Sequence, residues 1–417
     1  MKIRAVDLYC GAGGTSTGIL EACDEDLDVE VDLTAINHWP IAIDTHRLNH
    51  PDVRHICEPV QNLHPASVIP SRRLHLLAAG CECTYHSLAR GGGPCNEQSR
   101  SQPWQLVRWA SDIRVDNILM ENVREFLGWG PLHGRTKRPI RSRRGEYFRA
   151  FIQALENLGY SVEWKIQCAA DFGDHTSRPR LILMARLGRK VVWPQPTHGP
   201  GLQPQRTARQ IIDWSLVGRS IFGRRRPLCN NTLKRIAAGL QKYGGRDAEP
   251  FIIMLNGGSP AHVAASVKSI DEPLPTITAG GNHACLVEPF IVQTDQCGGG
   301  GIYARSVDSP IGTVVSKQNM LLIQPLIMKY YKSGRCRPVD LPLDTITTKA
   351  RFMLVQCGET TVWLDILVRM LQPYELAAAH SFPRHYQFTG NKEAQTKQIG
   401  NSVPIRLARA HARAILS

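Results

Sequence analysis

The sequence predicts a doubly wound α/β domain followed by a smaller, β-rich domain. In the first 190 residues, short apolar runs alternate with amphipathic segments, as in strands joined by helices in a parallel sheet. The length of 417 residues exceeds what one hydrophobic core usually holds, so two domains are expected. From Val191 the sequence becomes rich in proline, which marks the end of the α/β pattern.

The α/β part contains six candidate strands and one clear helix. The strands are expected at residues 3–9, 33–36, 74–79, 117–120, 162–167 and 181–185. The helix is expected at 146–158, where apolar side chains recur at three- and four-residue spacing: Tyr147, Phe148, Phe151, Ile152, Leu155 and Leu158. These side chains are therefore predicted to lie in the core.

The second domain is predicted at residues 191–364 and contains a weak triplication. The three units begin at Pro250, Pro289 and Pro325, and each carries an Asp-x-Pro-x-x-Thr turn, at 271–276, 308–313 and 340–345. Fixed periods of this size indicate stacked supersecondary units. Their polar loops suit a recognition surface, and a purely structural array is the alternative. Residues 365–417 return to helical spacing and are expected to rejoin the first domain.

The composition indicates a protein without a membrane span or disulfide framework. No run of about 18 apolar residues appears, and the N-terminus lacks the features of a secretory signal. We therefore expect a cytoplasmic protein, whose twelve cysteines remain reduced.

The net charge of +14 is clustered, which indicates a polyanionic partner. A solvated basic surface is the alternative for either cluster taken alone. The clusters consist of Arg135, Lys137, Arg138, Arg141, Arg143 and Arg144, and of Arg224, Arg225 and Arg226.

The segment "AVDLYCGAGGTSTG" predicts a cofactor turn. Its strand ends at Tyr9, and Gly11, Gly13 and Gly14 follow before a helix. Glycines at such a turn allow close approach to the backbone. A dinucleotide fingerprint requires a third glycine where Ser16 stands, so a nucleoside without a pyrophosphate fits better. The alternative is a tight turn without a ligand.

The segment "GCECTYHSLARGGGPCNEQS" contains Cys81, Cys83 and Cys95 directly after another strand. A thiolate at a strand end can attack an electron-poor carbon if a nearby charge lowers its pKa. An inert buried thiol is one alternative. A zinc site is another, although the paired Cys-x-x-Cys of structural sites is missing. Its ligands would be Cys81, Cys83, His86 and Cys95.

Two further motifs place polar side chains at the same sheet edge. "ILMENVREF" leaves Glu121 and Asn122 at a strand end, where a carboxyl can hold and transfer a proton; ordinary helix capping is the alternative. "SRPR" directs Arg178 and Arg180 to one side of an incoming strand, where two guanidinium groups suit a base carbonyl or a phosphate.

These motifs, in this order and ending with "RMLQPYELAAAHSFP" and "QIGNSVP", resemble the DNA cytosine-5 methyltransferases over almost the whole chain. The resemblance implies an S-adenosylmethionine-dependent methyltransferase fold with a target-recognition domain. It implies that Cys83 is the nucleophile, that Glu121 grips the cytosine at N3 and N4, and that Arg178 and Arg180 contact the base and the active site. The cofactor contacts that it implies are Asp7, Tyr9, Gly11, Gly13, Gly14, Asn37, His38, Glu58, Asn401 and Val403.

The sequence departs from the family pattern in three places. Glu82, Thr84 and His86 replace the usual Pro, Gln and Phe around Cys83. Cys95, in "GGPCNEQS", matches the motif letters better, but it lies sixteen residues past the strand, whereas Cys83 lies four past it. We therefore favour Cys83. Asn37 stands where an acidic residue is usual, and Thr176 replaces a usual Gln.

The resemblance further implies double-stranded DNA as the substrate, a flipped cytosine and a bacterial or phage-infected cell, and a monomer is the default expectation. Two alternatives remain open at this point. One is a tRNA cytosine-5 methyltransferase of the same family, and the other is a DNA-binding homologue that has lost catalysis.

Overall fold

The computed structural model describes residues 2–81, 100–243, 250–255, 260–279, 283–293, 303–305, 326–329, 335–338, 352–355 and 363–417. The chain divides into two compact units. Unit 1 comprises Met1–Ile211, Pro273–Gly281 and Pro373–Ser417, and unit 2 comprises Ile212–Glu272 and Asn282–Gln372. Each unit is described by itself.

Unit 1 is built on a seven-stranded sheet whose strand order is β3-β2-β1-β4-β5-β8-β6. The first five of these strands are parallel, and β8 runs antiparallel to both β5 and β6. All six predicted strands are present; β1 has the predicted length, shifted by one residue, and the other five are longer than predicted. The additional strand, β3, has only three residues, too few for a readable apolar pattern. The bounds are β1 (Lys2–Leu8), β2 (Glu30–Ile36), β3 (Arg54–Ile56), β4 (Arg73–Gly80), β5 (Arg114–Asn122), β6 (Tyr160–Cys168) and β8 (Pro179–Leu187).

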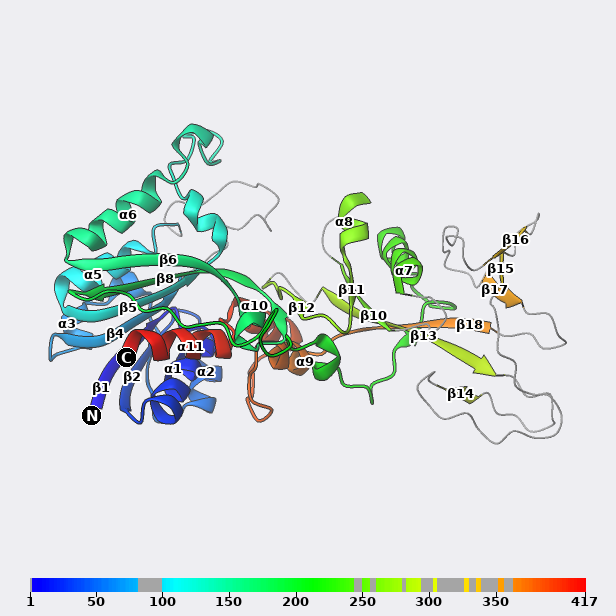
Figure 1. Ribbon diagram of the computed structural model, residues 1–417, viewed down its shortest axis with the longest axis horizontal. Coiled ribbons are helices and arrows are strands. Elements are labelled where there is room, and N and C mark those ends of the chain that lie inside the picture. Colours follow the sequence, from blue (N-terminus) through cyan, green and yellow to red (C-terminus); the bar gives the residue numbers. More distant parts are fainter. Residues whose placement is uncertain are drawn as a thin grey trace. The chain divides into compact units, whose positions relative to one another are not determined.

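Helices cover both faces of this sheet, as the doubly wound class requires (Figure 1). On one face α3 (Pro65–Val68), α5 (Trp104–Asp112) and α6 (Glu146–Asn157) share a core with the strands. On the other face α1 (Gly14–Glu21), α2 (Pro40–Asn49) and α11 (Ile405–Leu416) share a second core. Of the six apolar side chains that predicted α6, four are buried, and Tyr147 and Leu158 are partly buried against the same core. The predicted fold class is therefore confirmed.

The C-terminal segment packs directly on the first helix of the chain. A Cβ on Gly18 of α1 would lie 2.7 Å from the Cβ of Ala408 on α11, so glycine is what allows these helices to approach. The Arg409 guanidinium also binds both carboxylate oxygens of Asp26, at 2.8 Å each. Two more helices, α9 (Pro373–Ala379) and α10 (Lys392–Asn401), lead to α11.

The unit boundaries differ from the predicted ones at 190 and 364. The proline-rich segment stays in unit 1 up to Ile211, because Val191 is buried and Trp193 packs beside it against the core under α11. Conversely, unit 2 extends to Gln372, because β18 (Trp363–Met370) pairs with β13 (Ala284–Gln293).

One further short segment inside the predicted second domain belongs to unit 1. Its strand β12 (Leu274–Pro275) pairs with β7 (Thr176–Ser177). The first Asp-x-Pro-x-x-Thr turn thus ends in unit 1, and the second and third lie outside the described residues.

Unit 2 contains a mostly antiparallel sheet covered by helices. Its strands follow the order β11-β10-β13-β18-β9, and β14 also pairs with β13. These strands share a hydrophobic core with α7 (Asn230–Tyr243). A separate sheet has the order β16-β15-β17. The remaining bounds are α8 (Pro260–Ala265), β9 (Arg219–Ser220), β10 (Phe251–Met254), β11 (Val267–Ser269), β14 (Tyr303–Arg305), β15 (Leu326–Lys329), β16 (Arg335–Pro338) and β17 (Phe352–Val355).

Candidate active site

The parallel strands of unit 1 bring most of the predicted site residues to one sheet edge. Because β1, β2, β3, β4 and β5 all run the same way, the segments that follow them lie at the same edge. The glycine-rich turn follows β1, Asn37 and His38 follow β2, Glu58 follows β3, and Glu121 lies near the end of β5.

Among the described residues, no helix has the length and apolarity that crossing a membrane requires.

The three glycines of the turn have different roles. A Cβ on Gly13 would lie 2.5 Å from the Tyr386 hydroxyl, and a Cβ on Gly14 would lie 2.2 Å from the Ser402 hydroxyl and the Val403 carbonyl. At Gly11, with φ of +54°, such a Cβ would meet only the Tyr9 carbonyl, at 3.9 Å. Gly13 and Gly14 therefore serve internal packing, and Gly11 is the glycine that leaves space for a ligand.

Backbone strain in the turn is balanced by side chains from distant segments. Tyr9 adopts φ of +60°, which is unfavourable for a residue with a side chain. The Tyr386 hydroxyl donates to the Ala12 carbonyl and lies 3.4 Å from His50 Nε2, which in turn lies 3.0 Å from the Thr17 hydroxyl. Burial lowers the pKa of His50 to about 4, so the ring is neutral at pH 7. Sequence reasoning missed Tyr386 and His50, because neither stands in a recognisable spacing with the glycines.

Asp7 lies at the end of β1 with a buried carboxyl group. One oxygen accepts a hydrogen bond from the Ser16 hydroxyl at 2.6 Å, and the other has no partner among the described residues. Burial raises the pKa of Asp7 to about 7. An unpartnered carboxylate oxygen at the glycine-rich turn fits a cationic ligand group.

The turn after β2 separates two residues that were predicted together. The Asn37 side chain is buried and accepts from the Trp39 amide at 2.9 Å, so it closes the turn. His38 is exposed beside it, and the half-buried Trp39 ring carries the Lys397 ammonium 4.8 Å from its centroid. His38 and Trp39 are thus the side chains that this turn presents, and Trp39 was missed. Glu58 is exposed after β3.

The closing motif is fixed against the same turn. Val403 is buried, Asn401 at the end of α10 is exposed, and the Ser402 and Val403 backbone lies against Gly14. A Cβ on Gly400 would lie 2.5 Å from Thr278, so this glycine permits the close contact with the short segment that contains β12.

Glu121 and Arg180 form a largely buried ion pair. Arg180 Nε lies 2.8 Å from Glu121 Oε1, and the side chains are 9% and 13% exposed. Glu121 lies opposite Gly80 in the register between β5 and β4. The pair holds the carboxyl group in one orientation at the end of the sheet.

Arg178 was predicted to act with Arg180, but its guanidinium is engaged elsewhere. Its side chain is 2% exposed and donates to the Ile277 carbonyl at 2.7 Å and to the Gly400 carbonyl at 2.9 Å. These contacts join the β12 segment to the closing motif. Contact of Arg178 with the base stays a prediction, whereas the two hydrogen bonds fix the backbone at Ile277 and Gly400.

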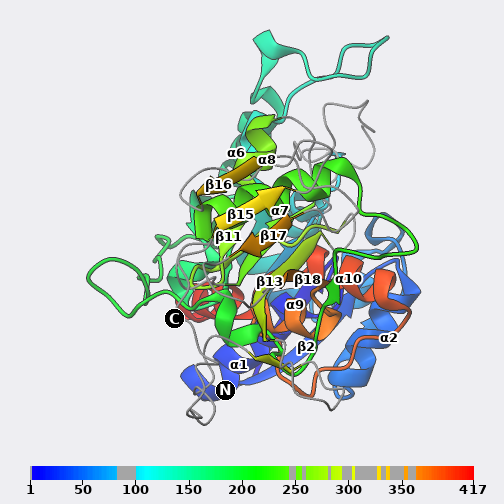
Figure 2. The same cartoon turned by 90° about the vertical axis from the view of Figure 1, so that its right-hand side faces the viewer.

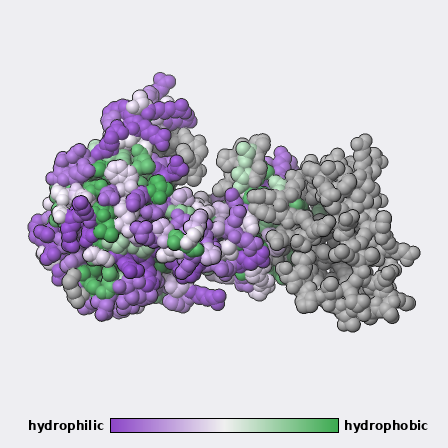
Figure 3. Space-filling view, viewed as in Figure 1, coloured by the Kyte–Doolittle hydropathy of each residue, from purple (hydrophilic) through white to green (hydrophobic). Residues whose placement is uncertain are grey.

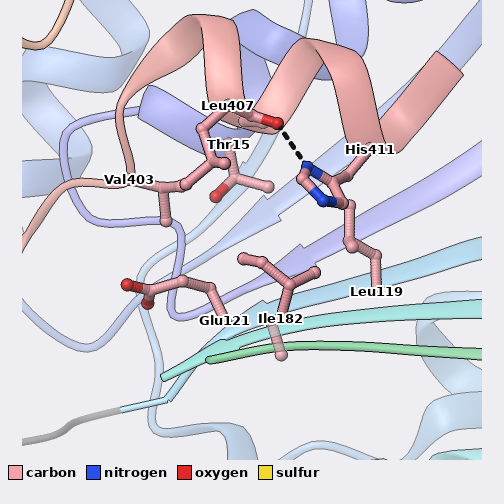
Figure 4. A pocket seen from close by; sticks show the side chains of 9 residues that line it. Thr15, Leu119, Glu121, Ile182, Val403, Leu407 and His411 are labelled. Carbon is pink, nitrogen blue, oxygen red and sulfur yellow. Dashed lines mark hydrogen bonds between the residues drawn. The ribbon is translucent and has the colours of Figure 1, made fainter. Parts of the chain in front are cut away.

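A small, mainly apolar pocket lies between the sheet and helices α1 and α11 (Figure 4). Figure 4 shows the Glu121 carboxyl at one end and the His411 ring at the other. His411 Nδ1 donates to the Leu407 carbonyl at 2.8 Å, and burial lowers its pKa to about 4. The other lining residues are Thr15, Ala79, Leu119, Ile182, Val403, Leu407 and Ala408.

Of the three cysteines after β4, only Cys81 lies in the described residues. It is 3% exposed, and burial raises the pKa of its thiol, with the Glu121 charge adding to the effect. Such a thiol is inert at neutral pH. Cys83, Cys95, Glu82, Thr84 and His86 lie outside the described residues, and with them most of the suggested zinc ligands.

Solved structures with this fold are methyltransferases. The chain aligns over 100% of its length with 100% of Spodoptera frugiperda DNMT2, a mutant form, at a TM-score of 0.54 and 14% identity. It aligns over 99% of its length with 98% of a putative DNA modification methyltransferase from an Escherichia coli prophage, at a TM-score of 0.52 and 16% identity. The chain thus shares its fold with these proteins.

The sequence comparisons define the family. Residues 3–206 and 304–417 match the C-5 cytosine-specific DNA methylases, and the chain belongs to this family. It is 25% identical to the Type II methylase M.HgiDII of Herpetosiphon aurantiacus, over 98% of this chain and 94% of that protein. It is 24% identical to the Type II methyltransferase M1.HphI of Haemophilus parahaemolyticus, over 100% and 87%. The predicted family and enzyme class are confirmed: the protein is a DNA cytosine-5 methyltransferase.

Proposed function

We propose that the protein transfers a methyl group from S-adenosylmethionine to C5 of a cytosine flipped out of a specific duplex DNA sequence, with Cys83 as the nucleophile. The observation that carries this proposal is the Glu121–Arg180 pair opposite Gly80. Only two residues separate Gly80 from Cys83, and each residue spans at most about 3.6 Å. By chain length alone, a nucleophile at Cys83 would stay within about 11 Å of Gly80, which lies opposite the residue that would hold the base. Cys95 follows twelve residues later and is not restricted in this way.

The residues around the glycine-rich turn fit S-adenosylmethionine, which carries a sulfonium and an ammonium group. The free oxygen of Asp7 suits a cation, Gly11 leaves its backbone open, and His38 and Trp39 offer polar and aromatic contacts. Asn401 and Val403 would complete the site from the closing motif, with Tyr9 and Glu58 on neighbouring strand ends. Bound there, the cofactor would supply an electrophilic methyl group.

The side chains on the base side would perform covalent catalysis. The Cys83 thiolate adds to C6 of cytosine while N3 takes up a proton from solvent, which the Glu121 carboxyl stabilises, and C5 becomes nucleophilic. After methylation, C5 loses its proton to solvent, the C6–S bond breaks, the Cys83 thiolate leaves and N3 returns its proton to solvent. Arg180 orients the Glu121 carboxyl throughout, and Arg178 holds Gly400 and thereby the closing motif.

Unit 2, whose residues are inserted in the sequence between the three parts of the chain that build unit 1, would read the DNA sequence. Flipping one base costs a few kcal/mol of unstacking, which contacts with the duplex would offset. The names of M.HgiDII and M1.HphI favour a restriction-modification role.

The test is expression in a bacterial host without cytosine methylation, beside Cys83→Ala and Cys95→Ala variants. Genomic DNA is digested to nucleosides for mass spectrometry, and modified positions are mapped by bisulfite sequencing. We expect 5-methylcytosine in one sequence context, abolished by Cys83→Ala and retained by Cys95→Ala. Loss with Cys95→Ala alone would assign the nucleophile to Cys95. Unmodified DNA from a folded protein would refute the proposed function.

A further inference from the structure

The segment between β5 and α6 forms a braced hairpin, which we call the basic hairpin (residues 131–140). Leu132 and Pro139 form an antiparallel bridge. The His133 amide donates to the Arg138 carbonyl at 2.8 Å, and the Ile140 amide donates to the Pro131 carbonyl at 3.1 Å. The hairpin extends beyond the sheet in the views of both Figure 1 and Figure 2.

The neck of the hairpin is anchored in the core of unit 1. The Tyr147 and Phe148 amides both donate to the Trp129 carbonyl, which closes the segment at its base. Trp129 is 1% exposed and stacks on Phe126 with 5.2 Å between ring centroids. A Cβ on Gly130 would lie 2.3 Å from the Arg143 carbonyl, so the two sides of the neck are in close contact. The tip is therefore held by a rigid base.

The basic hairpin and its neck carry a uniform positive charge. Residues 126–145 contain six Lys or Arg and no Asp or Glu. Residues 133–139 are all exposed, and Figure 3 shows the projection as a largely hydrophilic surface. Glu146, the first acidic residue beyond it, is already paired with Arg143. Arg135, Lys137, Arg138 and Arg141 thus face no acidic residue within the segment.

The basic hairpin follows the end of β5, which also carries Glu121. Five residues of 3₁₀ helix, Arg124–Gly128, connect Asn122 and Val123 to the neck. The segment that carries the charges therefore starts from the sheet edge where the target cytosine would bind. Duplex DNA carries one phosphate charge per roughly 1.7 Å of its axis, so a duplex bound at that edge would offer many partners for these cations.

We propose that the basic hairpin binds the phosphate backbone of duplex DNA beside the target cytosine. This inference rests on the proposed function and names the element of unit 1 that holds the flank of the substrate. Cations on a braced hairpin lose little conformational entropy on binding, so each contact retains its counterion-release contribution. Phosphate contacts position the duplex without reading its sequence, so the effect is the same for every sequence.

The test compares two double variants that each remove one Arg and one Lys. Arg135→Gln/Lys137→Gln alters the basic hairpin. Arg189→Gln/Lys190→Gln is the matched control, because these exposed residues follow β8, which ends at the opposite edge of the sheet. Both are measured in the full chain by fluorescence anisotropy on a duplex with the mapped site and on an unrelated duplex. The salt concentration is varied from 0.05 to 0.2 M.

We expect the hairpin variant to bind both duplexes roughly 10- to 60-fold more weakly at 0.1 M salt. Its slope of log K against log salt should be smaller by about 1.8, which is 0.9 for each lost phosphate contact. The control variant should keep more of the wild-type slope, and both variants should keep the wild-type Tm.

Equal affinity and slope in the hairpin and control variants would overturn the inference. Weakened binding to tRNA with unchanged binding to duplex DNA would also overturn it. Failure of the proposed function is separate, because it appears as unmethylated DNA with the wild-type protein, whereas the hairpin is judged by binding alone.

Discussion

The glycine-rich turn and the Glu121–Arg180 pair lie at the same sheet edge, but different interactions hold them. The turn is fixed by close packing and hydrogen bonds from remote segments, through Tyr386, Ser402 and Val403. Glu121 is held by its largely buried ion pair with Arg180. Shape therefore dominates at the glycine-rich turn, and charge dominates at Glu121.

Because of this difference, we expect the two regions to respond differently to substitution. Packing is sensitive to shape and volume, so changes at the turn should affect stability and cofactor binding. An ion pair at a reacting base is sensitive to charge, so changes at Glu121 should affect the chemical step. Arg178 combines the two cases, because its charged side chain holds the packed backbone at Ile277 and Gly400.

The largest effect is expected from Glu121→Gln, which keeps the shape and removes the carboxylate. Methyl transfer under single-turnover conditions should fall by about 10²- to 10⁴-fold, since a neutral amide stabilises a protonated N3 much less than a carboxylate does. Cofactor affinity, measured by calorimetry, should stay at the wild-type value. Glu163→Gln on β6, which removes a carboxylate bound to Trp193, is the control and should retain activity. A loss of less than tenfold at Glu121 would contradict its role in stabilising the protonated N3.

Arg178→Lys should have the next largest effect, now on stability. A lysine has no planar fork and cannot satisfy both the Ile277 and the Gly400 carbonyl, so one buried acceptor loses its partner. The free energy of unfolding should fall by about 1–3 kcal/mol. Arg72→Lys, an exposed arginine that donates to one carbonyl, should be nearly neutral in the same urea titration. Equal effects at both sites would contradict the role assigned to Arg178.

Tyr386→Phe tests the bracing of the turn. Loss of the hydroxyl leaves the Ala12 carbonyl unpartnered, so the free energy of unfolding should fall by about 1–3 kcal/mol. Tyr160→Phe removes a matching bond to the Val115 carbonyl, far along the chain from the turn. Both variants should lose similar stability, but only Tyr386→Phe should weaken cofactor binding, about 5- to 30-fold. Identical cofactor affinities would show that the bracing is structural only.

Much of the fold could be predicted, because strand alternation and helical spacing are local properties of the sequence. The strands β1, β4, β5 and β8 and the helix α6 were predicted from such patterns. The domain boundary was not, because prolines predict the end of a periodic pattern and say nothing about packing. Val191 and Trp193 follow β8 without regular structure and still belong to the core.

The candidate site was predictable only where a strand end carries the side chain. Glu121 follows this rule, since parallel strands bring their ends together, whereas Asp7 was named only through the family resemblance. The roles of Arg178, Asn37 and Gly13 were not predictable, because each depends on a contact with a segment far away in the sequence or on a local turn. Tyr386 reaches the Ala12 carbonyl across 374 positions, and no spacing rule covers such a distance.

Asp7 gives the smallest effect and the sharpest test of the cofactor side. Its pKa of about 7 means that the folded protein binds the proton more tightly than the unfolded chain. Its stabilising contribution is therefore complete below about pH 4 and is lost as the pH rises through 7. A cationic cofactor group would favour the carboxylate and release this proton. Affinity for S-adenosylmethionine should then rise up to tenfold from pH 6 to pH 7 and level off above it.

The same titration in buffers of different ionisation enthalpy counts the protons released on binding. Asp7→Asn should abolish the release, because the amide carries no proton to lose. Asp174→Asn is the matched control, since burial also raises the pKa of Asp174 to about 7 but its carboxyl accepts from the Leu407 amide at the start of α11. Proton release that survives Asp7→Asn and disappears with Asp174→Asn would move the cation site from the glycine-rich turn to α11. The glycine-rich turn would then contribute to cofactor binding through its shape alone, without a charge.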